Sequence, residues 1–214
     1  MKEKKISLLQ MILTLLFVVS LLISNIITSK QMLLPFGIVM TGAVVIFPIT
    51  YILSDIFSEV YGYKWSRLTC YLAFIFNLFM VIIFTIVIKS PAPDFWTNQS
   101  AFEIVLGNTP RILFASLTAF MLGDFVNDKV FKEMKEKYID NHNGFNSRAI
   151  LSSFCGEFTD SLIFIPLAFI GTMPFENMII MGITQVLIKT SYELLILPIT
   201  NILMKKVSSY EYKN

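Results

Sequence analysis

Ionisable side chains within long apolar runs are the residues here whose types and spacing could do chemistry. Glu157 and Asp160 lie three residues apart, and Gln185, Lys189 and Glu193 recur at steps of four. Residues three or four apart share one face of a helix. An acid pair on one face could bind a cation, share a proton or accept hydrogen bonds from a polar ligand. The alternative is a structural ion pair with Lys189, which would only hold two helices together.

A second acid pair, Asp55 and Glu59, lies at the end of an earlier apolar run, four residues apart. Ionisable groups at membrane depth normally face a cavity or a partner, which makes these acids candidates for function. Lys64 and Arg67 follow closely in the sequence. The alternative is therefore an interfacial turn in which the two acids pair with the two basic residues.

Amides and a third acid group complete the inventory of polar residues in apolar runs. Asp124 and Asn127 lie near the end of one run, and Asn25 and Ser29 share a face at the end of the first. For Asn25 the alternative is a hydrogen bond between helices. We interpret the lone amide of Asn77 as such a contact between helices.

The composition sets the class of protein that must position these residues. The chain has 214 residues, of which 55% are apolar and 15% are charged, whereas soluble domains have about 25% charged residues. This excludes a soluble globular domain, a disordered chain and a nucleic-acid binder driven by basic charge. Because the apolar runs are continuous rather than alternating, the sequence predicts transmembrane helices and not a barrel.

The apolar runs predict an all-α polytopic membrane protein with a bundle of six transmembrane helices in a single domain, residues 1–214. Each crossing needs about 20 residues. The predicted spans are 8–28, 37–60, 68–88, 112–130, 147–171 and 175–204. Thirteen Lys and Arg residues lie in the two termini, in the loop after the second span and in the region 129–148, whereas the opposite side has three, Lys30, Lys89 and Arg111. The excess of basic residues predicts that both termini are cytoplasmic.

Motifs of other function classes are missing from the sequence. It has no nucleotide-binding loop, no zinc-ligand spacing and no nucleophile elbow, so we expect neither an enzyme nor a metal or cofactor. Cys70 and Cys155 fall within apolar runs and are interpreted as buried thiols. An intramembrane enzyme that uses the acid pairs on a metal or lipid is disfavoured because there is no histidine cluster. The remaining chemistry is recognition inside the membrane.

The polar groups suit a small, flat, polar solute. A carboxylate can accept two adjacent N–H donors of a guanine-type edge, and Lys, Gln or Asn can donate to its carbonyl. Phe or Tyr rings can stack on its flat face. These residues alone do not choose such a base over a vitamin or an amino acid.

Four segments resemble the queuosine precursor transporter family. They are FPITYILSDIFSEVYGYKWSR at 47–67, SNIITSK at 24–30, FCGEFTDSLIFIPLAF at 154–169 and QVLIK at 185–189. The resemblance implies a six-helix bacterial transporter of the cell membrane that imports 7-deazaguanine bases: the cyano and aminomethyl precursors of queuosine, or queuine. That family is similar to the vitamin-binding S-components of energy-coupling-factor transporters, but works without their ATPase module.

The resemblance also implies which residues bind substrate. The candidates are Asn25, Lys30, Asp55, Glu59, Glu157, Asp160, Gln185 and Lys189, with Asp124 and Asn127 on a looser match. In this hypothesis Glu157 and Asp160 bind the N–H edge, while Asp55 and Glu59 form an inner gate.

The primary hypothesis is a secondary transporter or facilitator in a lipid bilayer, with a 7-deazapurine as its partner and no nucleic acid. The alternative is the substrate-binding S-component of an ATP-driven transporter. The sequence is also compatible with a homodimer.

Overall fold

The computed structural model describes residues 6–137 and 144–211, and the chain forms two compact units. The first unit comprises Met1–Lys30, Thr41–Pro110 and Glu193–Asn214, and the second comprises Gln31–Met40 and Arg111–Tyr192. Lys2, Lys4, Lys5 and Lys213, which enter the predicted orientation, lie outside the described residues.

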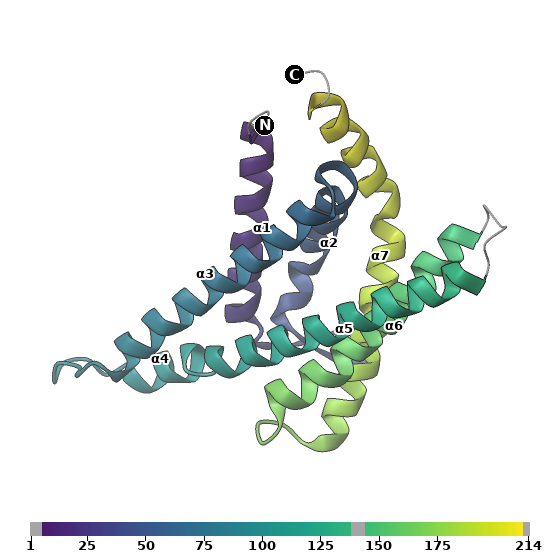
Figure 1. Cartoon of the computed structure of the whole chain (residues 1–214). Helices are drawn as coiled ribbons and strands as arrows, with labels where there is room; N and C mark the ends of the chain where they lie inside the picture. The colour runs from purple at the N-terminus through teal and green to yellow at the C-terminus, as the bar shows by residue number, and fades with distance from the viewer. Residues whose placement is uncertain (1–5, 138–143, 212–214) are drawn as a thin grey trace. The chain divides into compact units, whose positions relative to one another are not determined.

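Long apolar helices dominate the first unit, and Figure 1 shows α1, α2 and α3 beside one another. Its elements are α1 (Leu8–Ile27), η2 (Gly42–Val45), α2 (Phe47–Ile56), the π-helical turn η3 (Phe57–Tyr61), α3 (Tyr63–Lys89) and α4 (Gln99–Leu106). Ser7 caps α1 by accepting the backbone N–H of Gln10 at 2.9 Å. Phe17 and Phe57 pack edge to face, with ring centroids 5.7 Å apart.

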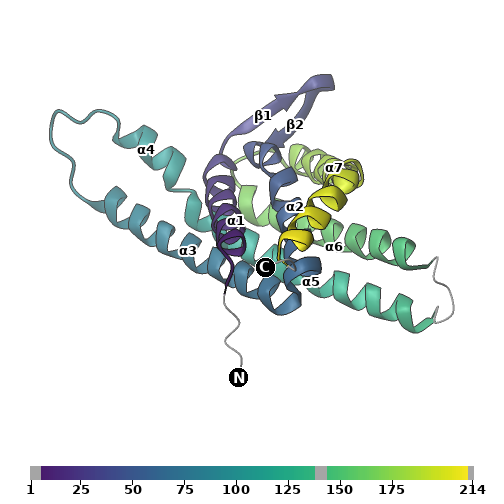
Figure 2. The same cartoon turned by 90° about the horizontal axis from the view of Figure 1, so that it is seen from above.

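The prediction of one helix over 37–60 is wrong, because residues of five different elements fall in that stretch. The strands β1 (Gln31–Leu34) and β2 (Ile38–Thr41) form a hairpin around the short helix η1 (Pro35–Gly37), as Figure 2 shows. Gly37 has a φ of 75°, which suits a turn. The β-branched residues after it favour a strand. The regular helix α2 begins only at Phe47, with Pro48 in its first turn.

The irregular segment 42–61 nevertheless runs antiparallel to α1 over the whole length of that helix. At one end, the Gly42 N–H donates to the Lys30 carbonyl at 2.7 Å. At the other end, the Ser7 and Tyr61 hydroxyls donate to the same carboxylate oxygen of Glu211, at 2.5 Å and 2.9 Å. A 20-residue helix such as α1 is about 30 Å long, which equals the hydrocarbon core of a bilayer. Segment 42–61 therefore covers the same height as α1.

The helix α3 runs parallel to α1 and packs against it at two levels. Trp65 donates its indole N–H to Thr14 at 3.3 Å, and Asn25 donates to Asn77 at 2.6 Å. The outer side of α3 leaves large apolar side chains exposed, among them Phe79 at 61% and Ile86 at 58%. A continuous apolar surface of this kind is typical of contact with lipid.

Three helices build the second unit: α5 (Thr109–Lys137), α6 (Gly144–Phe169) and α7 (Phe175–Glu211), of which α5 begins and α7 ends in the first unit. Their core includes Ile165, Phe169 and Met181. Arg111 donates to the carbonyls of Leu167 and Ile170 at 2.7 Å and 2.6 Å, and so satisfies the end of α6. The predicted spans 112–130, 147–171 and 175–204 overlap these three helices, and that each of them crosses a membrane stays a prediction.

Four stretches in the described part of the chain are long and apolar enough to cross a membrane. They are Leu8–Ile27, Lys64–Lys89, Gln99–Asn127 and Phe175–Ile196. The segment 42–61 and α6 are not among them, so the count of six spans stays a prediction.

Candidate functional site

An ion cluster joins α6 to α7 in the second unit. The ammonium of Lys189 lies 2.6 Å from Asp160 Oδ2 and 2.8 Å from Glu157 Oε2. The Lys189 side chain is 7% exposed, and the two acids are 21% and 23% exposed. Because Glu157 and Asp160 are one helical turn apart, both carboxylates reach the same cation. One lysine thus holds two acids within a largely apolar pair of helices.

Buried polar atoms without a hydrogen-bond partner lie near this cluster along α6 and α7. Gln185 lies one turn before Lys189 and is 2% exposed, yet its Oε1 has no hydrogen-bond partner among the described residues. The same is true of the hydroxyls of Ser161, one turn after Glu157, and of Thr190, next to Lys189. A buried acceptor left unpaired costs about 1–3 kcal/mol. These groups are therefore available to a polar ligand.

Two glycines bring α5 against α6 at the level of the cluster. Figure 1 shows these two helices side by side. A Cβ at Gly123 would lie 2.8 Å from the Gly156 carbonyl oxygen and 3.1 Å from Asp160 Cβ. A Cβ at Gly156 would lie 3.0 Å from Asn127 Cβ. The backbones can approach this closely only because both residues lack side chains. Sequence reasoning missed these glycines, although small residues within otherwise bulky apolar helices are a signal of close helix contact.

The close contact between α5 and α6 also positions Asp124 and Asn127, the two candidates that rest on a looser match to the family. Asp124 follows Gly123 directly and is half-buried, and Asn127 lies against Gly156. Of the predicted site residues, the second unit contains Glu157, Asp160, Gln185, Lys189, Asp124 and Asn127.

The other predicted site residues belong to the first unit. Asn25 is buried and donates to Asn77, whose own N–H group donates to the Ala73 carbonyl at 2.9 Å. The sequence predicts such a contact between helices for Asn77. For Asn25 it left this contact open as the alternative to a role in substrate binding. Asp55 is half-buried near the end of α2, and Glu59 is exposed in η3. Helices change to π geometry frequently at functional sites.

A hydrogen-bond network at the chain ends was not predicted from the sequence. Glu211 accepts from both Ser7 and Tyr61. Burial, followed by the hydrogen bond to Glu211 and its charge, raises the pKa of the Tyr61 hydroxyl above its ordinary value of about 10. The network ties the start of α1 and the turn η3 to the end of α7.

Residues 6–137 and 144–211 contain no group of three or more His, Cys, Asp or Glu side chains that could hold a metal ion. Apolar stretches long enough to span a bilayer, one of them in α7, together with a buried ion cluster between α6 and α7, define a helical membrane protein with an internal polar site.

Comparisons with known proteins identify the family. Residues 41–203 match the family described as "Putative vitamin uptake transporter", and the chain belongs to that family. It is also 26% identical over 168 residues to the "Probable queuosine precursor transporter" of Bacillus subtilis (strain 168), a match that covers 76% of this chain and 71% of the relative. No solved structure matches. The chain is thus a transporter and not an enzyme.

Proposed function

We propose that this protein imports queuosine precursors, 7-deazaguanine bases, across a bacterial plasma membrane as a secondary transporter or facilitator. We further propose that the Lys189 cluster and Gln185 form its substrate site. The observation that carries the proposal is the pair of carboxylates held by one buried ammonium beside an unpaired Gln185 Oε1. The name of the Bacillus subtilis relative supports the choice of substrate.

The groups of the cluster complement the edge of a 7-deazaguanine. One carboxylate accepts the ring N–H and the 2-amino group together, in the bidentate manner that makes such pairs strong. Lys189 donates to the base carbonyl, and Gln185 Oε1 accepts a further N–H. An aminomethyl group would be cationic and would take the second carboxylate. Phe164, one turn after Asp160 on α6, offers a ring for stacking.

The ion cluster also accounts for the empty state of such a carrier. A carboxylate without a partner is strongly disfavoured away from water. Lys189 satisfies both acids when no base is bound. Substrate binding then exchanges one set of charge-assisted hydrogen bonds for another, so both carboxylates keep hydrogen-bond donors in either state. Release on the other side of the membrane is the reverse exchange.

The test is uptake by bacteria that cannot make the precursor, with queuosine in tRNA as the readout. Each of the three bases is supplied separately. We expect Asp160→Asn and Lys189→Met each to lower uptake at least tenfold, the loss expected for about 1.4 kcal/mol of binding free energy. Glu176→Gln is the matched control, because Glu176 is an exposed acid at the start of α7. Normal uptake by an Asp160→Ala, Lys189→Ala double variant present in the membrane would contradict the site.

Reconstitution separates the two modes of transport. A secondary transporter or facilitator moves the base into vesicles when it is the only protein present. An S-component would copurify with a coupling protein and ATPases, and it would transport nothing alone.

A further inference from the structure

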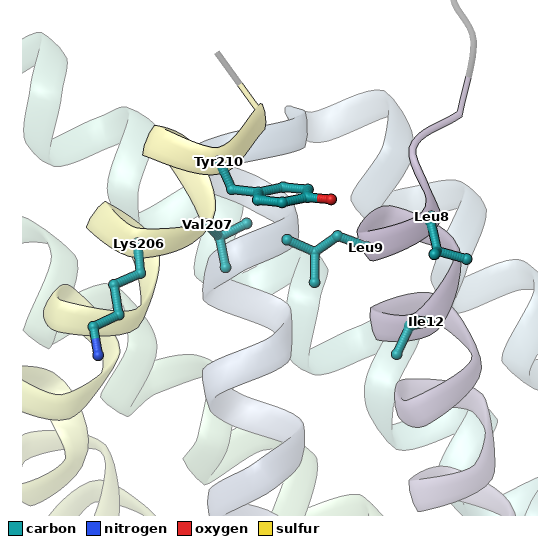
Figure 3. A pocket seen from close by; sticks show the side chains of 6 residues that line it. All are labelled: Leu8, Leu9, Ile12, Lys206, Val207 and Tyr210. Carbon is teal, nitrogen blue, oxygen red and sulfur yellow. The ribbon is translucent and has the colours of Figure 1, made fainter. Parts of the chain in front are cut away.

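A groove lies between the first turns of α1 and the last turns of α7, within the first unit. Its volume is about 360 Å³, and it is lined by Leu8, Leu9, Ile12, Lys206, Val207 and Tyr210. Figure 3 shows Leu9 and Tyr210 pointing toward each other across the gap, with Lys206 at the edge on α7. The groove is thus apolar along its length and carries one ammonium.

The lining requires an amphipathic occupant. Leu8, Ile12 and Tyr210 remain 64%, 49% and 50% exposed, so the structure leaves apolar surface uncovered here. An acyl chain covers such surface, and a Lys side chain beside it can follow the chain with its stem while its ammonium meets a headgroup. The helix ends are also where aromatic side chains such as Tyr210 meet a membrane interface.

The surrounding charge selects the headgroup. Lys205 and Lys206 are consecutive and exposed on α7. One nearby acid, Glu211, accepts from the hydroxyls of Ser7 and Tyr61, and the two exposed lysines outnumber it. Each basic residue near the surface adds attraction for anionic lipids that a zwitterionic lipid does not provide.

We propose that this groove binds an anionic phospholipid, with an acyl chain against Leu9, Ile12 and Val207 and the phosphate at the Lys206 ammonium. The bound lipid fills the space between α1 and α7 at the end where the Ser7–Glu211–Tyr61 network joins them.

A tryptophan in the groove would report the lipid. Tyr210→Trp is introduced together with Trp65→Phe and Trp96→Phe, since the sequence has only these two tryptophans. The full chain is reconstituted with brominated phosphatidylglycerol or brominated phosphatidylcholine, and quenching of the single tryptophan is compared. Lys206→Gln removes the proposed phosphate contact. Lys205→Gln is the matched control, because Lys205 does not line the groove.

We expect stronger quenching by the brominated phosphatidylglycerol, and a loss of about fivefold in that preference with Lys206→Gln but a smaller loss with Lys205→Gln. Equal quenching by the two lipids would overturn the proposal. Equal losses with the two lysine variants would overturn it too, because they would reveal a diffuse charge effect and no defined site.

Discussion

The ammonium of Lys189 lies in contact with both Glu157 and Asp160. Its removal in Lys189→Met leaves two acids close together in an apolar environment. We expect a loss of about 3–5 kcal/mol in the free energy of unfolding, measured by SDS titration of the purified protein in micelles.

A neutral version of the cluster separates folding from transport. The triple variant Glu157→Gln, Asp160→Asn, Lys189→Met removes all three charges of the cluster, so we expect most of the lost stability to return while uptake stays absent. If the triple variant is as unstable as Lys189→Met, the uncompensated acids are not the cause of the loss.

Tyr61 predicts a pH dependence at the residue scale. Its pKa is raised in the folded protein, so the folded state keeps the phenol proton to higher pH than the unfolded state does. The stabilisation is complete below about pH 10, the ordinary tyrosine pKa, and is lost as the pH rises above it. Ultraviolet titration of tyrosinate, compared between the native chain and Tyr61→Phe, isolates this group. A Tyr61 that ionises with the exposed tyrosines would contradict the prediction.

The amide pair Asn25–Asn77 is a second contact whose strength can be measured. A double-variant cycle with Asn25→Ala and Asn77→Ala should give a coupling free energy of about 0.6 kcal/mol, and at most about 1.7, as for other hydrogen bonds between membrane helices. A coupling near zero, with uptake lost in Asn25→Ala alone, would instead favour the role in substrate binding that the family resemblance implies.

Sequence reasoning found the acids and the lysine of the cluster because charges within apolar runs are conspicuous. It could not decide which acid contacts Lys189, because Glu157 and Asp160 lie on a different helix and Glu193 lies one turn further along the same helix. The glycines Gly123 and Gly156 were missed because their effect depends on a neighbouring backbone. A pattern within one helix does not contain that information.

At the scale of elements, the contact of α5 with α6 predicts that the effect of a glycine-to-alanine substitution depends on whether the glycine lies at this contact. The added Cβ in Gly123→Ala would lie 2.8 Å from the Gly156 carbonyl oxygen and 3.1 Å from Asp160 Cβ, so the neighbouring atoms would have to move. We expect a loss of about 1–3 kcal/mol in stability and a weaker apparent affinity for the transported base, measured by uptake at several substrate concentrations.

Gly182→Ala is the matched control for this effect. Its Cβ would lie 3.7 Å from Ile165 Cδ1, an ordinary contact, in the same unit. We expect stability and uptake close to those of the native chain. Equal effects of Gly123→Ala and Gly182→Ala would show that the α5–α6 approach does not position Asp160.

The helices with uniform apolar runs were predicted within a few residues, as for α1 and α3. The stretch 37–60 was not, because hydropathy reports burial in lipid or protein and does not distinguish a strand or a π-helical turn from a helix. Gly37, the β-branched residues after it and Pro48 contained the local signals. Backbone geometry of this kind is tolerated at membrane depth where protein or a water-filled cavity covers it.

At the scale of the whole molecule, the open question is whether segment 42–61 crosses the bilayer, since this decides the sidedness of every later loop. The segment matches the length of α1 and runs antiparallel to it, which favours a crossing. With six spans, the exposed residues Leu33 and Asp94 face the outside and the exposed Lys64 faces the cytoplasm. Single cysteines at these positions, in a background with Cys70→Ser and Cys155→Ser, report the sidedness through an impermeant maleimide. We expect Leu33→Cys and Asp94→Cys to react in intact cells and Lys64→Cys only after permeabilisation. If Leu33→Cys and Lys64→Cys react from the same side, segment 42–61 re-enters the side it left and the six-span arrangement is wrong.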